Sequence, residues 1–266
     1  MDKTVGIVIP AYQPDAERLV QYVDALADTI DPARIHVELD APDQSALDEI
    51  AETSATIGVS EQRRGKGAAV TAGFDRLETH ILSFVDADGS TPPSSLVSVL
   101  DPVMQGWANL SVGSRRHADA HVSMHQSHIR RRLGDLLATI ARRLLPIALT
   151  DYQCGAKAID RRTWEHVRGD LTAPGFAWDI ELIGSAHAAG AEITEIPIVW
   201  EDKTGSTVRP LRTSIEFAWV LLRTWNRCNV AAGSRPHRIL QSLIPSPRPL
   251  IELPTTGSGP RNGGPP

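Results

Sequence analysis

The sequence predicts an α/β fold, in which helices flank a Rossmann-like, mostly parallel sheet, and three observations carry this prediction. Apolar runs of strand length recur along the first third of the chain, at 5–10, 34–39, 56–60 and 81–85. Segments with helical apolar spacing alternate with these runs, as in doubly wound sheets. Three of the runs stop at Pro10, Asp40 and Asp86. Because such sheets bind ligands beyond the carboxyl ends of their strands, these residues mark a candidate site.

The first half of the chain is expected to form four strand–helix units. The run at 5–10 is continuously apolar and ends at a proline, which is typical of a buried parallel strand. The segment that follows it places Leu19, Val23 and Leu26 on one helical face. By the same criteria, helices are expected at 15–30, 45–53, 66–78 and 92–104.

The second half is less regular. Its expected elements are a strand at 109–113, a long amphipathic helix at 125–149, a helix at 176–190 and a strand at 192–200. We therefore expect one domain over 1–210 and an amphipathic helix over 211–233. Residues 234–266 are rich in proline, glycine and serine without periodicity, which predicts a disordered tail.

Composition limits the partners and the cellular setting that are expected for this protein. The chain has 266 residues and a formal charge of -5, which argues against a nucleic-acid partner because phosphate binding needs a basic surface. Its two cysteines, Cys154 and Cys228, have neither metal-ligand nor redox spacing, so a reduced, cytoplasmic setting is expected. There is no apolar run of roughly 18 residues and no signal-peptide pattern, so no transmembrane segment is expected.

Two aspartates, Asp86 and Asp88, end the apolar strand in the segment LSFVDADGST. Side chains two residues apart on an extended chain point the same way, so both carboxylates can converge on one cation. Mg²⁺ or Mn²⁺ suits oxygen ligands, and Mg²⁺ usually completes its shell with water and substrate phosphates. The same pattern also fits two solvated loop aspartates that cap the next helix.

Two metal-dependent chemistries share this pattern. In haloacid-dehalogenase-like phosphatases the first aspartate is a nucleophile, but their motif lies near the start of the fold and needs a later acidic pair that this chain lacks. In nucleotide-sugar glycosyltransferases the pair holds a metal that bridges a diphosphate.

Seven segments, in order, resemble the polyprenyl-phosphate glycosyltransferases of family two, which include dolichyl-phosphate glucosyltransferase and dolichyl-phosphate mannose synthase. The segments are VGIVIPAYQP, RRGKGAAVTAGF, FVDADGSTPP, VGSRR, DYQCGAKAIDRRTW, FAWDIELI and EIPIVWEDKTGSTV. The resemblance as a whole covers roughly residues 4–225. The resemblance implies a GT-A fold and an inverting transfer of a hexose from a nucleotide diphosphate sugar to a polyprenyl phosphate.

The resemblance also implies site residues. Those expected at the nucleotide sugar are Pro10, Tyr12, Asp40, Asp86, Ala87, Asp88, Gln153, Lys203 and Arg209. Those expected at the metal are Asp86, Asp88 and Ser90. Catalytic roles are expected for Asp86, Asp88, Arg115, Arg130 and Arg131. Among these, Arg115 would lie near the diphosphate, and Arg130 and Arg131 would receive the phosphate of the lipid acceptor.

Two further residues have alternative interpretations. Lys66 stands between two glycines, so it either contacts the nucleotide sugar or simply begins a helix, because the spacing of a P-loop is missing. Asp179, with Glu181, is either catalytic or an anchor for a loop near the sugar.

The chain also departs from the family pattern: Gln13 and Pro14 replace Asn-Glu, and ELDAPD keeps only one aspartate of the usual Asp-Asp-Gly-Ser. The nucleotide base and the sugar therefore stay open.

The lipid acceptor implies contact with a membrane surface, at the cytoplasmic, inner face. The segment SIEFAWVLLRTWNR places aromatic residues beside arginines, which suits a helix that lies in the interface, although packing on the domain is the alternative. The alternatives in function are a soluble family-two transferase acting on a sugar or cell-wall acceptor, the phosphatase, and a non-catalytic sugar-nucleotide-binding protein.

Overall fold

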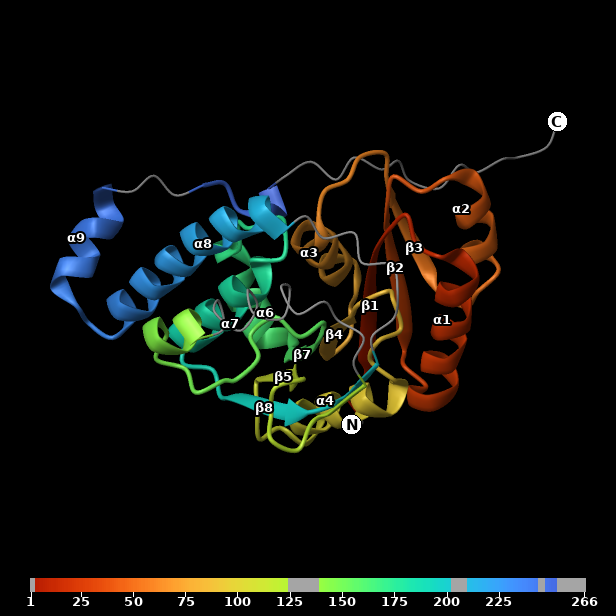
Figure 1. The fold of residues 1–266 in the computed structure, drawn as a ribbon, viewed down its shortest axis with the longest axis horizontal. Coiled ribbons are helices and arrows are strands. Elements are labelled where there is room, and N and C mark those ends of the chain that lie inside the picture. Colours follow the sequence, from red (N-terminus) through yellow and green to blue (C-terminus); the bar gives the residue numbers. More distant parts are fainter. Residues whose placement is uncertain (1–2, 124–138, 202–209, 244–246, 253–266) are drawn as a thin grey trace.

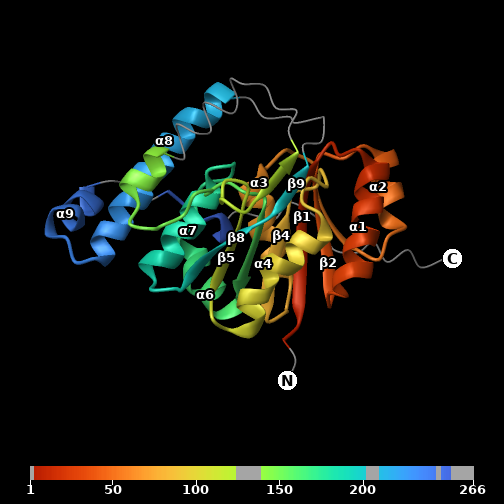
Figure 2. The same ribbon diagram turned by 60° about the horizontal axis from the view of Figure 1, so that its bottom comes forward.

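The computed structural model describes residues 3–123, 139–201, 210–243 and 247–252, which form three layers (Figure 1). A central sheet is covered by helices on both faces, and the C-terminal helices extend the layer on one side (Figure 2).

The central sheet has seven strands in the order β3-β2-β1-β4-β7-β5-β8. They are β1 (Val5–Tyr12), β2 (Arg34–Asp40), β3 (Thr56–Ser60), β4 (Ile81–Val85), β5 (Leu110–Ser114), β7 (Ala156–Asp160) and β8 (Ile193–Pro197). Neighbouring strands are parallel, except that β7 runs antiparallel to both β4 and β5. The prediction of a mostly parallel sheet is confirmed, and β3 and β4 have the predicted bounds.

The helices divide between the two faces of the sheet. One face carries α1 (Ala16–Ile30), α2 (Gln44–Ala51) and α4 (Pro93–Gln105). The other carries α3 (Lys66–Arg76), α6 (Arg161–Val167), α7 (Trp178–Ala188) and α8 (Pro210–Ala231), with the short turns η1 (Arg168–Asp170) and η2 (Leu250–Glu252). α9 (Arg235–Leu243) lies at the end of this layer, far from α1 and α2 (Figure 1). Each face of the sheet thus has its own apolar core.

Local sequence explains where the helices begin and end. Asp15 caps α1 by accepting a hydrogen bond from the Arg18 N–H at 3.1 Å. α4 begins at a proline, whose missing N–H costs nothing at that position, and ends at Gly106, whose φ of 80° favours glycine.

An aromatic cluster fills the core beneath α3, α6 and α7. Phe74 meets Trp164 edge to face with ring centroids 5.0 Å apart, and Trp178 meets Phe84 at 5.6 Å. The Trp178 indole N–H donates to the Thr71 hydroxyl at 3.0 Å. Because Trp178 is the first residue of α7, this packing fixes the start of that helix and the position of its next residue, Asp179.

Three sequence predictions differ from the structure. The strand predicted at 192–200 is divided at Ile198, and its second part, β9 (Val199–Glu201), pairs with β6 (His121–Ser123) in a separate two-stranded sheet. Of the helix predicted at 125–149, residues 125–138 lie outside the described part, and residues 139–144 are helical. The helix stops there because a residue that precedes a proline, here Leu145 before Pro146, disfavours the helical conformation.

Two segments of the region predicted to be a disordered tail have regular structure. α9 forms at 235–243, and η2 returns to the domain at 250–252. Leu250 is buried in the second apolar core, and its N–H donates to the Leu171 carbonyl at 2.8 Å. Composition predicted disorder, but single apolar residues within a polar segment suffice to dock it.

Among the described residues, no helix is long and apolar enough to cross a membrane.

Candidate active site

The candidate site lies where the strand order reverses. From β1 the chain proceeds outward to β2 and β3, and then returns to place β4 on the other side of β1. In such sheets the carboxyl ends of the two central strands border the ligand crevice. Pro10 and Tyr12 belong to the end of β1, and Asp86 to Asp88 follow β4 directly, so the structure brings these predicted residues to one edge.

The carboxylate of Asp86 rests against the backbone of the neighbouring strand. The Asp86 N–H donates to the Gly155 carbonyl at 2.9 Å. A Cβ atom at Gly155 would lie 1.8 Å from Asp86 Oδ2, so no other residue fits at Gly155 without displacing the carboxylate. The Asp86 side chain stays 40% exposed, which leaves it accessible to a ligand.

Asp88 and Ser90 complete the acidic edge. The Ser90 N–H donates to Asp88 Oδ1 at 2.9 Å. Burial, followed by the neighbouring charge of Asp86, raises the pKa of Asp88 above its ordinary value. The Ser90 hydroxyl is buried and makes no hydrogen bond within the described residues. Two carboxylates whose charges interact and an orphaned hydroxyl are a donor set that fits Mg²⁺ or Mn²⁺, with substrate oxygens supplying the other ligands.

This donor set is small. The part of the chain that the structure describes contains no group of three or more His, Cys, Asp or Glu residues that could hold a metal ion. A cation at Asp86 and Asp88 would therefore depend on ligand oxygens from a substrate.

Lys66 reaches the acidic pair from α3. Its ammonium lies 3.0 Å from Asp86 Oδ1 and 3.2 Å from Asp179 Oδ2, and only 7% of its side chain is exposed. Burial acts to lower the pKa of Lys66, but the charges of Asp179 and Asp86 outweigh it and raise that pKa.

The glycines beside Lys66 have a packing role. A Cβ at Gly65 would lie 2.6 Å from the Pro174 carbonyl, and one at Gly67 would lie 2.5 Å from Trp178 Cβ. Gly65 also has a φ of 101°, which L-residues with side chains rarely adopt. Lys66 thus begins a helix and also contacts Asp86.

Asp179, for which the sequence left a catalytic and an anchoring role open, is buried in the structure. It is 1% exposed and pairs with two lysines, Lys66 and Lys157, the latter at 2.6 Å from its Oδ1. The Lys157 ammonium also donates to the Cys154 carbonyl at 2.7 Å. Both oxygens of the Asp179 carboxylate therefore face lysines rather than solvent. Glu181 anchors a loop instead, because it accepts hydrogen bonds from the N–H groups of Thr172 and Ala173, each at 2.7 Å.

Arg115 is held by a bidentate ion pair. Its Nε lies 2.7 Å from Asp151 Oδ2 and its Nη2 lies 3.0 Å from Asp151 Oδ1. Burial alone would raise the pKa of Asp151, but the Arg115 guanidinium holds it well below its ordinary value. The Gln153 N–H donates to Asp151 Oδ1 at 3.1 Å, so the predicted residues Arg115 and Gln153 share one anchor. The Arg115 guanidinium also lies over the Trp200 ring, 5.7 Å from its centroid.

Asp40, which is expected to contact the nucleoside, makes its hydrogen bonds in this structure to a loop of the chain itself. Its Oδ2 accepts the N–H groups of Arg64 and Gly65 at 2.7 and 3.0 Å, and its Oδ1 accepts Arg64 Nε at 2.7 Å. Arg64 Nη2 reaches the buried Glu38 at 2.6 Å. Both oxygens of Asp40 thus hold the loop that leads into Lys66.

The neighbouring Arg63 lies over the Tyr12 ring at 4.2 Å, which places a cation and an aromatic face at the end of β1.

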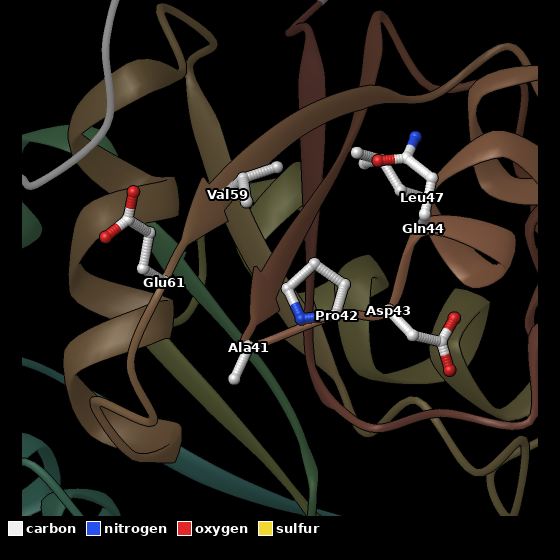
Figure 3. A pocket seen from close by; sticks show the side chains of 7 residues that line it. All are labelled: Ala41, Pro42, Asp43, Gln44, Leu47, Val59 and Glu61. Carbon is white, nitrogen blue, oxygen red and sulfur yellow. The ribbon is translucent and has the colours of Figure 1, made fainter.

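A shallow pocket lies beyond Asp40, at the ends of β2 and β3 (Figure 3). Its lining is formed by Ala41, Pro42, Asp43, Gln44, Leu47, Val59 and Glu61. Asp43 caps α2 by accepting the Ala46 N–H at 2.8 Å, and the carboxylate of Glu61 lies on the far side from Gln44 and Leu47 in Figure 3. None of these residues is a predicted metal ligand.

Four predicted residues, Arg130, Arg131, Lys203 and Arg209, lie outside the described part of the chain. The strand before Lys203 does approach the site, because the Glu201 N–H at the end of β9 donates to the Ser90 carbonyl at 2.9 Å.

The helix predicted to lie on a membrane has two kinds of surface. Phe217 and Leu221 are buried against α7, and Trp225 packs against the same core. Trp219 and Leu222 are 62% and 45% exposed. Packing on the domain therefore accounts for part of the apolar pattern, and Trp219 and Leu222 remain for another contact.

Sequence reasoning missed three contributors, Asp151, Gly155 and Lys157. All three belong to the segment DYQCGAK, which was singled out as a motif, but only Gln153 was given a role there. The signal was available in the residue types: an acid, a glycine and a lysine within seven residues beside a metal motif.

The comparisons with known proteins agree with this geometry. The family model described as Glycosyl transferase family 2 matches residues 6–167, more than half of the chain. The chain belongs to glycosyl transferase family 2. The family that the motifs indicated is confirmed.

The chain aligns with part of the length of several curated relatives. The chain is 27% identical over 233 residues to Glycosyltransferase AglD of Haloferax volcanii, with 83% of this chain and 37% of the relative covered. It is 28% identical to Dolichyl-phosphate beta-glucosyltransferase of Dictyostelium discoideum, covering 61% and 51%. It is 30% identical to Polyprenol monophosphomannose synthase of Mycolicibacterium smegmatis, covering 61% and 62%. The chain thus spans between about a third and three fifths of these relatives.

Solved structures confirm the fold. Glucosyl-3-phosphoglycerate synthase from Mycobacterium tuberculosis, in complex with Mn²⁺, uridine diphosphate and phosphoglyceric acid, superposes with a TM-score of 0.65 at 18% identity. The match covers 85% of this chain and 78% of that one. The GT-A fold predicted from the motifs is confirmed.

Proposed function

We propose that this family 2 member is an inverting glycosyltransferase, which moves a hexose from a nucleotide diphosphate sugar to a polyprenyl phosphate. The observation that carries the proposal is the acidic edge at the switch point, where Asp86 and Asp88 follow β4 and the Ser90 hydroxyl is orphaned. In support, a solved structure of the same fold contains Mn²⁺ and uridine diphosphate. Mg²⁺ or Mn²⁺ held by these residues would stabilise the departing diphosphate as a Lewis acid.

The remaining chemistry falls to the chain's own residues. Arg115, fixed by Asp151, supplies positive charge close enough to Asp86 for the two charges to interact, and Lys66 supplies more. Preorganised charges of this kind stabilise a leaving group without reorganising during the reaction. The acceptor phosphate is already anionic, so attack on the anomeric carbon needs no strong general base. This agrees with an Asp179 that is buried between two lysines.

The acceptor is the finer part of the proposal. Relatives named for dolichyl phosphate and for polyprenol monophosphomannose support a polyprenyl phosphate. Arg130 and Arg131 are proposed to dock its phosphate through charge-assisted hydrogen bonds. Lys203 and Arg209, which follow the strand beside Ser90, are proposed to contact the donor diphosphate, and Pro10, Tyr12 and Ala87 the rest of the nucleotide sugar.

Purified protein incubated with Mg²⁺, polyprenyl phosphate in detergent and a panel of labelled nucleotide sugars tests this function. We expect label in the organic extract from at least one donor, and none with Asp86→Asn. Label that stays water-soluble, on a sugar acceptor, would instead identify the soluble transferase. Release of phosphate without sugar transfer would identify the phosphatase.

Contact with the inner, cytoplasmic face of the membrane is a further part of the proposal. The exposed Trp219 and Leu222 on α8 and the 64% exposed Ile239 on α9 support it, together with the exposed Arg235 and Arg238. Flotation with anionic liposomes tests it. Trp219→Glu should reduce flotation, whereas Trp107→Glu, at a 54% exposed tryptophan beyond α4 in the opposite layer, should not. Equal flotation of both variants and the parent would contradict membrane contact through α8.

A further inference from the structure

A chain of alternating charges runs inward from the acidic pair. Asp86 contacts Lys66, Lys66 contacts Asp179, and Asp179 contacts Lys157, at distances between 2.6 and 3.2 Å. The exposure of these side chains falls from 40% at Asp86 to 7% at Lys66 and 1% at the last two. The outer end is therefore open to ligands, while the inner end is fixed.

The inner end fixes the outer lysine. Asp179 is held by Lys157, which is itself tied to the Cys154 carbonyl at 2.7 Å. Removing a charge from a buried pair leaves its partner unpaired at high cost, so Asp179 and Lys157 stay together. Asp179 then keeps the Lys66 ammonium beside Asp86.

From this arrangement we infer that Lys66 acts as a built-in counter-cation of the metal site. In the donor-free protein its ammonium occupies one oxygen of Asp86 and repels a bare divalent cation. A diphosphate offers the same ammonium new oxygen partners, and the flexible stem of lysine permits the exchange. Lys66 thus makes the cation and the donor bind together. This inference rests on the proposed function, since it assumes a cation at Asp86 and Asp88.

The inference predicts a defined energetic coupling. Nucleotide binding relieves the repulsion between Lys66 and the cation, so uridine diphosphate strengthens cation binding by more than its own oxygen ligands account for. Without the lysine charge, a bare cation binds more tightly and the additional benefit from the nucleotide shrinks by the same factor.

Binding of Mn²⁺ followed by electron paramagnetic resonance, with and without uridine diphosphate, tests the inference without any enzymatic assay. Lys66→Met should bind bare Mn²⁺ about tenfold more tightly than the parent, because a full charge has been removed from contact distance. The strengthening of Mn²⁺ binding by the nucleotide should fall by about the same factor. Asp179 keeps Lys157 as its partner, so this variant should fold; Lys66→Gln repeats the test with a polar side chain.

Two controls separate the possible failures. Lys66→Arg retains the charge and should keep weak bare Mn²⁺ binding, and Asp86→Asn should abolish binding in every background. Unchanged or weaker binding of bare Mn²⁺ by both Lys66→Met and Lys66→Gln, while the parent binds Mn²⁺ with the nucleotide through Asp86, would overturn this inference alone. Failure of the parent to bind Mn²⁺ even with the nucleotide would overturn the proposed function, and this inference with it.

Discussion

The carboxyl ends of β2 and β4 both carry aspartates, yet the two ends differ in what those aspartates are free to bind. Asp40, at the end of β2, is 2% exposed, and both of its oxygens accept hydrogen bonds from Arg64 or Gly65. Asp86, after β4, is 40% exposed and contacts Lys66, and the Ser90 hydroxyl is unpaired among the described residues. Position at the edge of the sheet predicts where a site lies, whereas the partners of each side chain decide which residue can take a ligand.

The difference predicts opposite effects for the same substitution at the two ends. Asp86→Asn or Asp88→Asn should lower the turnover number by about a thousandfold or more, because the cation loses a charged ligand. The free energy of unfolding should change by about 1 kcal/mol or less, since Lys66 keeps Asp179 as its partner. Transfer assays and urea denaturation of the same preparations measure both effects. Near-normal turnover in either variant would show that the substituted carboxylate at the end of β4 does not hold a cation needed for transfer.

Gly155 provides a second way to disturb the end of β4 without changing a charge. Gly155→Ala should lower the turnover number by about a hundredfold, because the new Cβ would lie 1.8 Å from Asp86 Oδ2 and must displace it. The matched control is Gly169→Ala, where a Cβ would meet nothing within 4 Å. Equal activity of the two variants would show that the backbone of Gly155 does not set the position of Asp86.

At the end of β2 the expected effect is on stability. Asp40→Asn should lower the free energy of unfolding by about 2–3 kcal/mol, because it breaks a buried ion pair with Arg64 and weakens two backbone hydrogen bonds. The turnover number should fall much less than in Asp86→Asn. A stable, inactive Asp40→Asn protein would instead indicate direct contact between Asp40 and the nucleoside, as the family resemblance first suggested.

The smallest effect concerns Asp151, a buried carboxylate that, like Asp40, is held by an arginine. Its folded-state pKa is depressed by Arg115, so its ion pair stabilises the protein above the ordinary aspartate pKa of about 3.9 and loses this contribution as pH falls further. Asp151→Asn should therefore make the unfolding free energy less dependent on pH below about pH 4, by about 1 kcal/mol per pH unit. Urea denaturation of parent and variant at several acidic pH values measures this. Parallel pH profiles would show that the pair contributes nothing.

The sequence predicted the elements and the acidic pair because both are encoded locally. Apolar runs gave β3 and β4 with correct bounds, and Asp86 and Asp88 follow β4 directly. The partners of these carboxylates are not local. β7 enters the sheet antiparallel between β4 and β5, which places Gly155 on Asp86 and Asp151 on Arg115. No periodicity within the chain specifies that insertion.

Two other predictions were incomplete for a related reason. The pattern in α8 predicted an apolar helix but could not tell which residues pack on α7 and which stay exposed, since that depends on the partner helix. The role of Lys66 depended on Asp179, which only the packing of Trp178 beneath α3 brings within reach.

The central claim is that Asp86 and Asp88 hold a divalent cation on the diphosphate of a sugar donor. A crystal structure of the protein with Mn²⁺ and uridine diphosphate, with anomalous scattering used to locate the metal, tests it most directly. The account predicts one manganese peak bound by both carboxylates and by diphosphate oxygens, with the Lys66 ammonium moved from Asp86 to a phosphate. Carboxylates turned away from the nucleotide, or a manganese peak at another site, would contradict it.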